Sequence, residues 1–238
     1  AFFEILLHVG TLGAVFVFYW KDVLNLIKEG LLLIKDCVLF VFKRQRMEMY
    51  LERKMVVFII IASIPTAVLG LLMEAFLEDL FLSSVIAVGF ALLVTGTMLL
   101  MIRRMPQGHK TLKQMKGRDA LTIGIVQGIA TIPGISRSGS TVTAGIFCGM
   151  DKEFAFRFSF LMSIPAILGA AVLKILDVDG ADLAANGGPY LVGMLVAGIV
   201  GYASIRWLKN LIQKDQFHYF GYYCLAVGLI SIVCGIFM

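Results

Sequence analysis

The sequence predicts an all-α, polytopic membrane protein with about six transmembrane helices, an interfacial helix and a re-entrant helical hairpin, in an inverted-repeat architecture. Its 238 residues are 59% hydrophobic and only 16% charged, which is not the balance of a soluble domain. Apolar runs long enough to span a bilayer recur along the chain. The 21 Lys and Arg outnumber the 16 Asp and Glu, and they gather in short segments between those runs, as in cytoplasmic loops. We therefore interpret the net charge as a marker of topology and expect no nucleic-acid partner.

Six apolar runs have the length of about 20 residues that a spanning helix needs. They are residues 2–20, 55–76, 80–102, 154–176, 189–207 and 217–238. The segment 21–42 is also apolar, but it carries two series of charges, each with a spacing of seven, so that all six share one helical stripe. These charges are Lys21, Lys28, Lys35, Asp22, Glu29 and Asp36. We expect an amphipathic helix in the membrane interface, with a true crossing as the alternative.

Residues 120–150 are predicted to form the re-entrant hairpin. The segment holds a single charge, Arg137, and is interrupted by helix breakers at Pro133, Gly134, Gly139 and Gly145. The basic linker 103–118 before it and the basic start of the next helix are both expected inside, whereas the acidic loop 177–188 is expected outside. The segment must then begin and end on the inner side. Irregular backbone at membrane depth is tolerated only inside protein or against water, which makes the turn a candidate site.

Internal similarity points to an inverted repeat. Residues 3–15 resemble residues 158–170, mainly in apolar and small positions, and Ser63-Ile64-Pro65 recurs at 163–165. The charge-derived topology gives 3–15 and 158–170 opposite directions through the membrane, as inverted repeats have. A hairpin before the second copy implies a partner hairpin before the first. We therefore expect residues 1–238 to be a single integral-membrane domain from a longer protein, without its N-terminal re-entrant hairpin.

The turn of the hairpin carries the groups that recognise phosphate. A lone arginine at membrane depth costs several kcal/mol unless it has a counter-charge, so Arg137 is expected to meet an anion. Its guanidinium is a bidentate fork suited to phosphate oxygens. Hydroxyl donors lie around it at Ser136, Ser138, Ser140 and Thr141. The alternative is a helix-packing surface of small residues with Arg137 reaching an interface, which leaves an arginine among four hydroxyls unexplained.

The helix breakers give this turn a predicted shape. Pro133 and Gly134 are expected to end the first half-helix, and Gly139 to permit a tight turn. Ser140 or Thr141 is then predicted to cap the second half-helix and to leave free N–H groups aimed at the turn. Such an N-terminus favours phosphate. The same arrangement suits an enzyme and a transporter.

Three polar residues outside the turn are further candidates. Gln127 would face the site if its half-helix points inward, and a hydrogen bond between helices is the alternative. Glu4 and His8 are four residues apart and share a helix face, where they could orient a metal ion or a base if that face meets Arg137. They could equally pair with each other, or Glu4 with Arg137, to hold the helices together.

Residues 133–141, PGISRSGST, resemble the PGxSRSxxT signature of the undecaprenyl-pyrophosphate phosphatases, the bacitracin-resistance type of integral-membrane lipid phosphatase. Residues 3–15, 62–72 and 153–170 also look like that family. The resemblance implies hydrolysis of a polyprenyl diphosphate to the monophosphate at the outer face of a bacterial plasma membrane, which recycles the peptidoglycan lipid carrier. It also implies a divalent cation, Mg²⁺ or Ca²⁺, and a multi-pass protein surrounded by membrane lipid. A homodimer is a further possible assembly.

The resemblance also assigns roles to residues of the turn. Arg137 would clamp the diphosphate and stabilise charge in the transition state, while Ser136, Ser138 and Thr141 line the catalytic pocket. The substrate-binding positions we expect beside them are Gly134, Gly139, Ser140 and Gln127.

One part of the family pattern is absent. Members carry, upstream of the segment that matches 2–15, a hairpin with paired glutamates, a Pro-x-Ser-Ser stretch and a histidine, which are the candidates for metal ligand, nucleophile and base. We therefore expect the chain alone to be inactive, and Glu4 is the remaining candidate metal ligand. A transporter that moves a polyprenyl phosphate between leaflets and a degenerate structural subunit are the alternatives to an enzyme.

Overall fold

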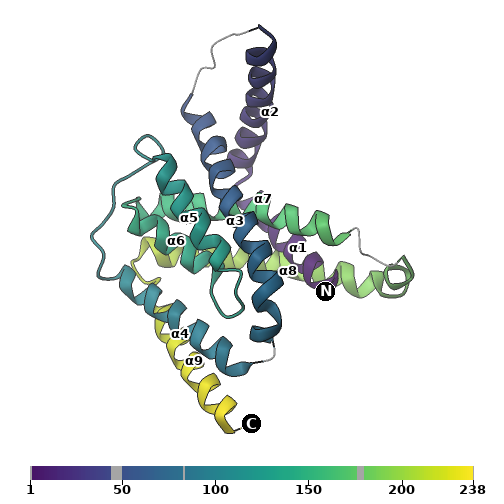
Figure 1. Cartoon of the computed structure of the whole chain (residues 1–238), viewed down its shortest axis with the longest axis vertical. Helices are drawn as coiled ribbons and strands as arrows, with labels where there is room; N and C mark the ends of the chain where they lie inside the picture. The colour runs from purple at the N-terminus through teal and green to yellow at the C-terminus, as the bar shows by residue number, and fades with distance from the viewer. Residues whose placement is uncertain (1, 44–49, 83, 176–179, 238) are drawn as a thin grey trace. The chain divides into compact units, whose positions relative to one another are not determined.

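The computed structural model describes residues 2–43, 50–82, 84–175 and 180–237, and over these ranges the chain is a series of α-helices with a longer irregular linker at 103–116 (Figure 1). The β-structure within the described ranges is one isolated bridge between Lys110 and Met150. The predicted all-α class is confirmed.

The helices follow one another in the order of their labels. They are α1 (Phe2–Phe18), α2 (Trp20–Lys43), α3 (Leu51–Leu82), α4 (Val85–Ile102), α5 (Gly117–Ile129), α6 (Arg137–Phe147), α7 (Lys152–Ile175), α8 (Gly180–Gln213) and α9 (Tyr219–Phe237).

Five helices of the described chain are long and apolar enough to cross a membrane, which confirms a polytopic membrane protein. The candidate spans are Leu51–Met73, Val85–Ile102, Lys152–Val172, Gly187–Gln213 and Tyr219–Phe237. They correspond to five of the six predicted spans. The other predicted span is α1, whose 17 residues cover about 26 Å at 1.5 Å per residue, slightly less than the ~30 Å hydrocarbon core.

Two predicted loops are helical instead. Residues 77–79 lie between two predicted spans, 55–76 and 80–102, but α3 continues to Leu82, because the segment contains helix-forming Leu, Glu, Ala and Met and neither Gly nor Pro. The next helix begins only after Ser84, whose Oγ accepts a hydrogen bond from the Ala87 N–H at 3.2 Å. In the predicted acidic loop 177–188, residues 177–179 lie outside the described ranges, and the chain is helical from Gly180 onward.

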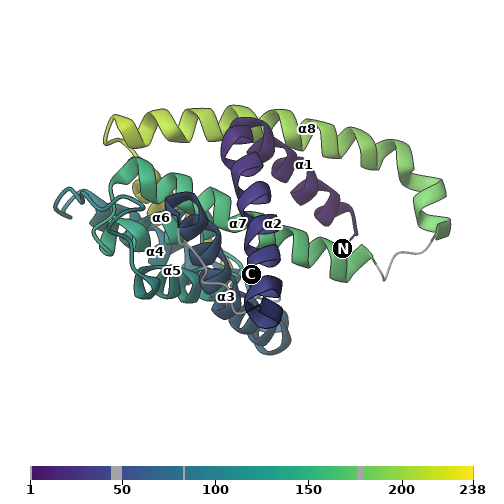
Figure 2. The same cartoon turned by 90° about the horizontal axis from the view of Figure 1, so that it is seen from above.

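The chain divides into two compact units: Ala1–Val56 with Phe160–Lys209, and Val57–Ser159 with Asn210–Met238. In the first unit, α1 packs closely on α8 (Figure 2). A Cβ at Gly10 would lie 2.2 Å from the Met194 carbonyl oxygen, so the two backbones meet where the side chain is only a hydrogen. The rings of Phe3 and Tyr190 stack nearby, with centroids 5.6 Å apart.

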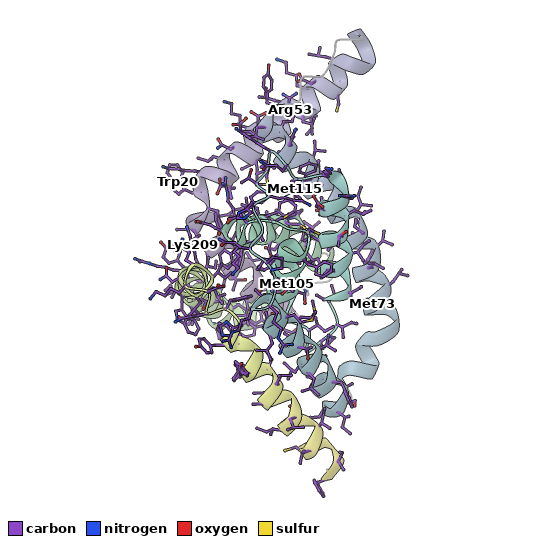
Figure 3. The ribbon with its side chains drawn as sticks, turned by 90° about the vertical axis from the view of Figure 1, so that its left-hand side faces the viewer. Trp20, Arg53, Met73, Met105, Met115 and Lys209 are labelled. Carbon is purple, nitrogen blue, oxygen red and sulfur yellow. The ribbon has the colours of Figure 1, made fainter. Side chains whose placement is uncertain are left out.

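In the same unit, the charged stripe of α2 binds the start of α3. Arg53 is only 3% exposed; its Nη1 donates to Asp36 Oδ2 at 2.7 Å, and its Nε lies 3.6 Å from Glu29 Oε2. Figure 3 marks Arg53 beside α2. The apolar stripe of α2 stays exposed and consists of Trp20, Leu24, Ile27, Leu31, Ile34 and Val38. The helix is amphipathic as predicted, and its place in the membrane interface stays a prediction.

The second unit contains an antiparallel pair, α4 and α9, joined through glycines (Figure 1). A Cβ at Gly96 would lie 2.8 Å from the Gly221 carbonyl oxygen, and the reverse distance is also 2.8 Å. Gly89 and Gly228 repeat this contact seven residues along each helix, at 2.9 and 2.8 Å. Such small-residue interfaces let membrane helices approach closely enough for backbone contacts.

Candidate functional site

Two short helices, α5 and α6, overlap the segment 120–150 that was predicted to re-enter the membrane, and its re-entrant placement stays a prediction. The two helices have 13 and 11 residues, so they extend about 20 and 17 Å and are too short to cross a ~30 Å core. The start of α5 and the end of α6 meet at Lys110. Its Nζ donates to the Cys148 carbonyl at 2.6 Å and lies 3.4 Å from Asp119 Oδ1. The start of α5 and the end of α6 therefore lie together, as a hairpin that begins and ends on one side requires.

A close contact with α3 holds the hairpin from one side. A Cβ at Gly124 would lie 2.2 Å from the Ala62 carbonyl oxygen. Thr66 Oγ1 lies 2.8 Å from that carbonyl and 2.9 Å from the Gly124 carbonyl, and its hydroxyl is directed at both. The first half-helix is thus fixed against α3 within the second unit.

Gly134 shapes the turn between the two helices. Its φ is +92°, a left-handed conformation that side chains disfavour, and a Cβ there would lie 2.8 Å from both Val88 O and Ala91 Cβ of α4. The prediction that Gly139 forms the tight turn is wrong, because Gly139 lies inside α6. Gly139 instead leaves room for the Ser136 side chain, because a Cβ at Gly139 would lie 2.9 Å from the Ser136 Oγ.

Ser136 is the N-cap of α6, and the prediction of Ser140 or Thr141 as the cap is wrong. The Ser136 Oγ accepts a hydrogen bond from the Gly139 N–H at 3.2 Å. A serine three residues before a glycine has both the acceptor and the room for this bond, so the helix starts earlier than predicted. Ser140 and Thr141 consequently lie within the helix.

Thr95 on α4 holds the turn in place, and sequence reasoning missed it. It is 1% exposed; its Oγ1 donates to the Gly134 carbonyl at 3.3 Å and accepts from the Ser136 N–H at 3.1 Å. One hydroxyl thus satisfies two backbone groups of the turn. No pattern in the sequence indicates that a threonine 41 residues before Ser136 contacts it.

The side chain of Thr141 is buried rather than open. Its Oγ1 donates to the Arg137 carbonyl at 2.9 Å and contacts the Ser159 Oγ of α7. The residue is 2% exposed, which makes it a support beneath the first turn of α6. Ser159 was not singled out from the sequence. The predicted catalytic role of Thr141 stays a prediction.

Two predicted substrate-binding residues have buried polar atoms without a partner in the described structure. Gln127 is 1% exposed and Ser140 is 2% exposed. Neither the Gln127 Nε2 nor the Ser140 Oγ has a hydrogen-bond partner there. Buried donors are normally paired, so each has capacity for a water molecule or a bound ligand.

Arg137 and Ser138 form the exposed first turn of α6. Within the described part of the chain, no carboxylate pairs with Arg137, in contrast to Arg53, Lys110 and Lys152. The first N–H groups of a helix have no intrahelical acceptor, and here the cap takes only that of Gly139. A guanidinium, a hydroxyl and the positive end of a helix dipole therefore lie at one exposed point, which suits an anion.

The donor set of this turn does not match a divalent cation. Mg²⁺ and Ca²⁺ prefer carboxylate and carbonyl oxygens, whereas the side chains described above are an arginine, hydroxyls and an amide. Within the described ranges, no group of three or more His, Cys, Asp or Glu residues could hold a metal ion. Glu4 and His8 are exposed residues of α1, in the first unit, and their meeting with Arg137 stays a prediction.

Fold and site define the class: a polytopic α-helical membrane protein that presents an arginine and free N–H groups at the N-terminus of a short hairpin helix. The family model described as "Bacitracin resistance protein BacA" matches residues 1–230. The chain belongs to this family, as the sequence resemblance predicted.

Similar proteins carry a common name, undecaprenyl-diphosphatase. The relative from Methanosphaera stadtmanae is 40% identical over 236 residues, which are 98% of this chain and 84% of the relative. Those from Methanobrevibacter smithii and Alkaliphilus metalliredigens are 41% and 43% identical, cover 96% and 98% of this chain, and are themselves covered to 82% and 83%. These relatives give no support to the transporter alternative.

Proposed function

We propose that this protein hydrolyses undecaprenyl diphosphate to undecaprenyl phosphate and inorganic phosphate, which returns a lipid carrier of cell-wall synthesis to use. Membership in the BacA family and the names of the relatives support the reaction. The observation that carries it is the exposed Arg137 at the N-terminus of α6, which has no carboxylate partner in the described structure.

Arg137 would bind the diphosphate through two parallel N–H···O bonds, because its planar fork matches two phosphate oxygens. The N–H groups of Arg137 and Ser138 and the Ser138 hydroxyl add donors that are already oriented. Charge on the terminal phosphoryl oxygens must be stabilised as the water oxygen bonds to phosphorus and the bridging P–O bond breaks. Donors that are fixed before the reaction stabilise this charge without reorganisation.

The second layer of the site keeps these donors fixed. Thr95 and Ser136 hold the turn, and Thr141 with Ser159 supports the first turn of α6 from below. We assign substrate binding to Gln127 and Ser140 as well, because their unpaired buried atoms would gain a hydrogen bond from the diphosphate or from a water molecule that bridges to it.

The site is proposed to open toward the outer face. We take the start of α5 and the end of α6 to be cytoplasmic, because the basic linker leads into α5 and these two ends lie together at Lys110. Helices of about 17–20 Å that start at the inner edge of a ~30 Å core carry their turn beyond its midplane. We keep a divalent cation as part of the proposal, with the diphosphate rather than the described side chains as its ligand, and a homodimer stays a prediction.

The test is phosphate release from undecaprenyl diphosphate by the complete gene product in detergent, with and without Arg137→Ala and with a chelator. We expect release by the wild type and about 10²–10³-fold slower release by the variant. A complete, folded wild-type protein that releases no phosphate would refute the proposed function. Full activity in the presence of chelator would remove the cation from it.

A further inference from the structure

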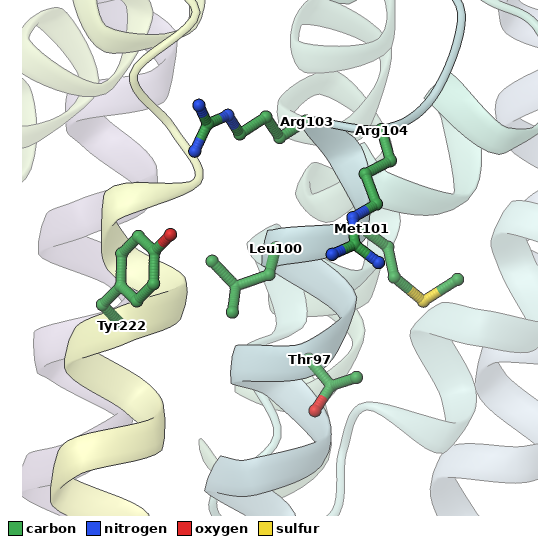
Figure 4. Close-up of a pocket in the computed structure, with 6 residues that line it drawn as sticks. All are labelled: Thr97, Leu100, Met101, Arg103, Arg104 and Tyr222. Atoms are coloured by element: carbon green, nitrogen blue, oxygen red, sulfur yellow. The ribbon is translucent and has the colours of Figure 1, made fainter.

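A second polar site lies on the side of α4 that faces away from the hairpin. A cavity of about 480 Å³ is lined by Thr97, Leu100, Met101, Arg103, Arg104 and Tyr222 (Figure 4). Thr97, Met101 and Arg104 are spaced as i, i+4 and i+7 and so share one face of the helix. Thr95 bonds to the hairpin turn from a different face of the same helix. The cavity is therefore separate from the site that contains Arg137.

Two cationic side chains line this cavity. Arg103 and Arg104 are exposed, and neither has an ion pair among the described residues. Figure 4 shows Arg103 reaching toward α9 above Tyr222, whose hydroxyl points upward, while Arg104 bends down toward Met101. Two guanidinium groups and a phenol thus border one space. Forked guanidinium donors fit the oxygens of a phosphate group.

Apolar side chains also line the cavity, and exposed hydrocarbon continues from it along the helices. Leu100 and Met101 line it, and exposed apolar residues extend away from it along both helices, among them Phe90 and Val94 on α4 and Leu229 and Ile230 on α9. These faces belong to helices that are apolar enough to span a membrane. They are suited to contact lipid chains.

Aromatic residues place the cavity at the level of lipid headgroups. Tyr219, Tyr222 and Tyr223 at the start of α9 are 57%, 51% and 65% exposed, and exposed tyrosines at the end of a span are typical of the membrane–water interface. Arg103 and Arg104 follow the last residue of α4 at the adjacent end of the antiparallel pair. Two cationic side chains beside an apolar surface at this level match an anionic lipid.

We propose that this cavity binds the phosphate headgroup of an anionic membrane phospholipid, with the acyl chains along the exposed faces of α4 and α9. Basic residues that serve only to orient a membrane protein need neither a cavity nor a neighbouring hydroxyl. Inorganic phosphate carries the same charged oxygens as the headgroup, but it has no acyl chains to contact the apolar surface beside the cavity. The proposal uses none of the residues assigned to hydrolysis. Its test measures lipid binding and not phosphate release, so its outcome is independent of the proposed hydrolysis.

The experiment measures binding to the delipidated complete protein in detergent by native mass spectrometry. The probes are phosphatidylglycerol, phosphatidylcholine and inorganic phosphate. The Arg103→Gln/Arg104→Gln variant removes two charges from the cavity, and the Lys113→Gln/Arg118→Gln variant removes two exposed charges from the same basic linker outside it. We expect phosphatidylglycerol to bind the cavity variant about 30-fold more weakly than wild type and the linker variant within threefold of wild type.

A third variant covers the case in which the double substitution disturbs folding. Tyr222→Phe removes one hydroxyl and no charge, and we expect it to weaken phosphatidylglycerol binding about fivefold. The proposal is overturned if phosphatidylcholine binds as tightly as phosphatidylglycerol, or if the linker variant loses as much affinity as the cavity variant. Inorganic phosphate that binds as tightly as the lipid, or unchanged lipid binding by Tyr222→Phe, would also overturn it.

Discussion

Removing the hydroxyl of Thr95 tests whether α4 positions the phosphate-binding turn. Thr95→Val keeps the shape of the side chain and removes both hydrogen bonds, the one to the Gly134 carbonyl and the one from the Ser136 N–H. Each backbone group left without a partner in this partly buried place costs about 1–3 kcal/mol. We expect a total loss of about 2–6 kcal/mol for the two groups, divided between lower global stability and displacement of the turn.

A displaced turn lowers catalysis because donors act only at the correct distance from the phosphoryl oxygens. A shift of about 1 Å in a positioned group can reduce rates about 10²-fold, so we expect kcat/KM for phosphate release to fall about 10–100-fold. The assay is phosphate release by the complete gene product, together with thermal unfolding in the same detergent. Thr95→Ser retains the hydroxyl and should restore most of the activity.

Thr122→Val is the matched control for this prediction. Thr122 is exposed on α5, and its hydroxyl bonds only to the Arg118 carbonyl of its own helix, so its removal should change kcat/KM and stability little. If Thr95→Val kept both stability and kcat/KM within twofold of wild type, the argument that α4 holds the turn through this hydroxyl would be wrong.

Three further substitutions test other parts of the account. Gly134→Ala forces a side chain into a left-handed conformation, which costs about 1–2 kcal/mol, and places its Cβ against α4. The rate of phosphate release should therefore fall at least tenfold, and an unchanged rate would contradict the turn geometry. Gly221→Ala directs a Cβ at the Gly96 carbonyl and should lower the unfolding temperature. The control is Gly169→Ala, which has nothing within 4 Å of the new Cβ and should leave the unfolding temperature equal or higher. Equal shifts of the unfolding temperature in the two variants would contradict the glycine interface. Arg53→Met leaves Glu29 and Asp36 without their cation and should destabilise the first unit by about 3 kcal/mol, as measured by denaturant unfolding, and a neutral result would contradict a stabilising role for the pair.

The sequence predicted the features that depend on composition and on local charge. Five spans follow from apolar runs of sufficient length, because hydrocarbon excludes unpaired backbone and charge. Basic segments on both sides of 120–150 predicted that this segment turns back within the membrane, which stays a prediction. The structure does bring the start of α5 and the end of α6 together at Lys110. The charge spacing in α2 likewise predicted one stripe, and two of its acids do contact one arginine.

Features that depend on a choice among similar residues, or on distant contacts, were not predictable in this way. Ser136, Ser140 and Thr141 are all competent caps; in the structure Ser136 caps α6, and its own N–H bonds to the distant Thr95. Neither Thr95 nor Ser159 has a local signal, because both are hydroxyl residues in apolar helices, where such residues are common. The acidic end of α3 is helical rather than a loop, because its residues favour a helix and it contains neither Gly nor Pro.

The most direct test of the central claim compares two arginines in the first turns of the two hairpin helices. Arg137 is the first residue of α6, Arg118 follows Gly117 at the start of α5, and both arginines are exposed. The measurement is kcat/KM for phosphate release from undecaprenyl diphosphate by the complete gene product. We predict a loss of about 10²–10³-fold for Arg137→Ala, only partial recovery with Arg137→Lys because an ammonium cannot form the bidentate fork, and a change of less than threefold for Arg118→Ala. Equal effects of the two alanine substitutions would contradict the assignment of Arg137 as the group that holds the diphosphate.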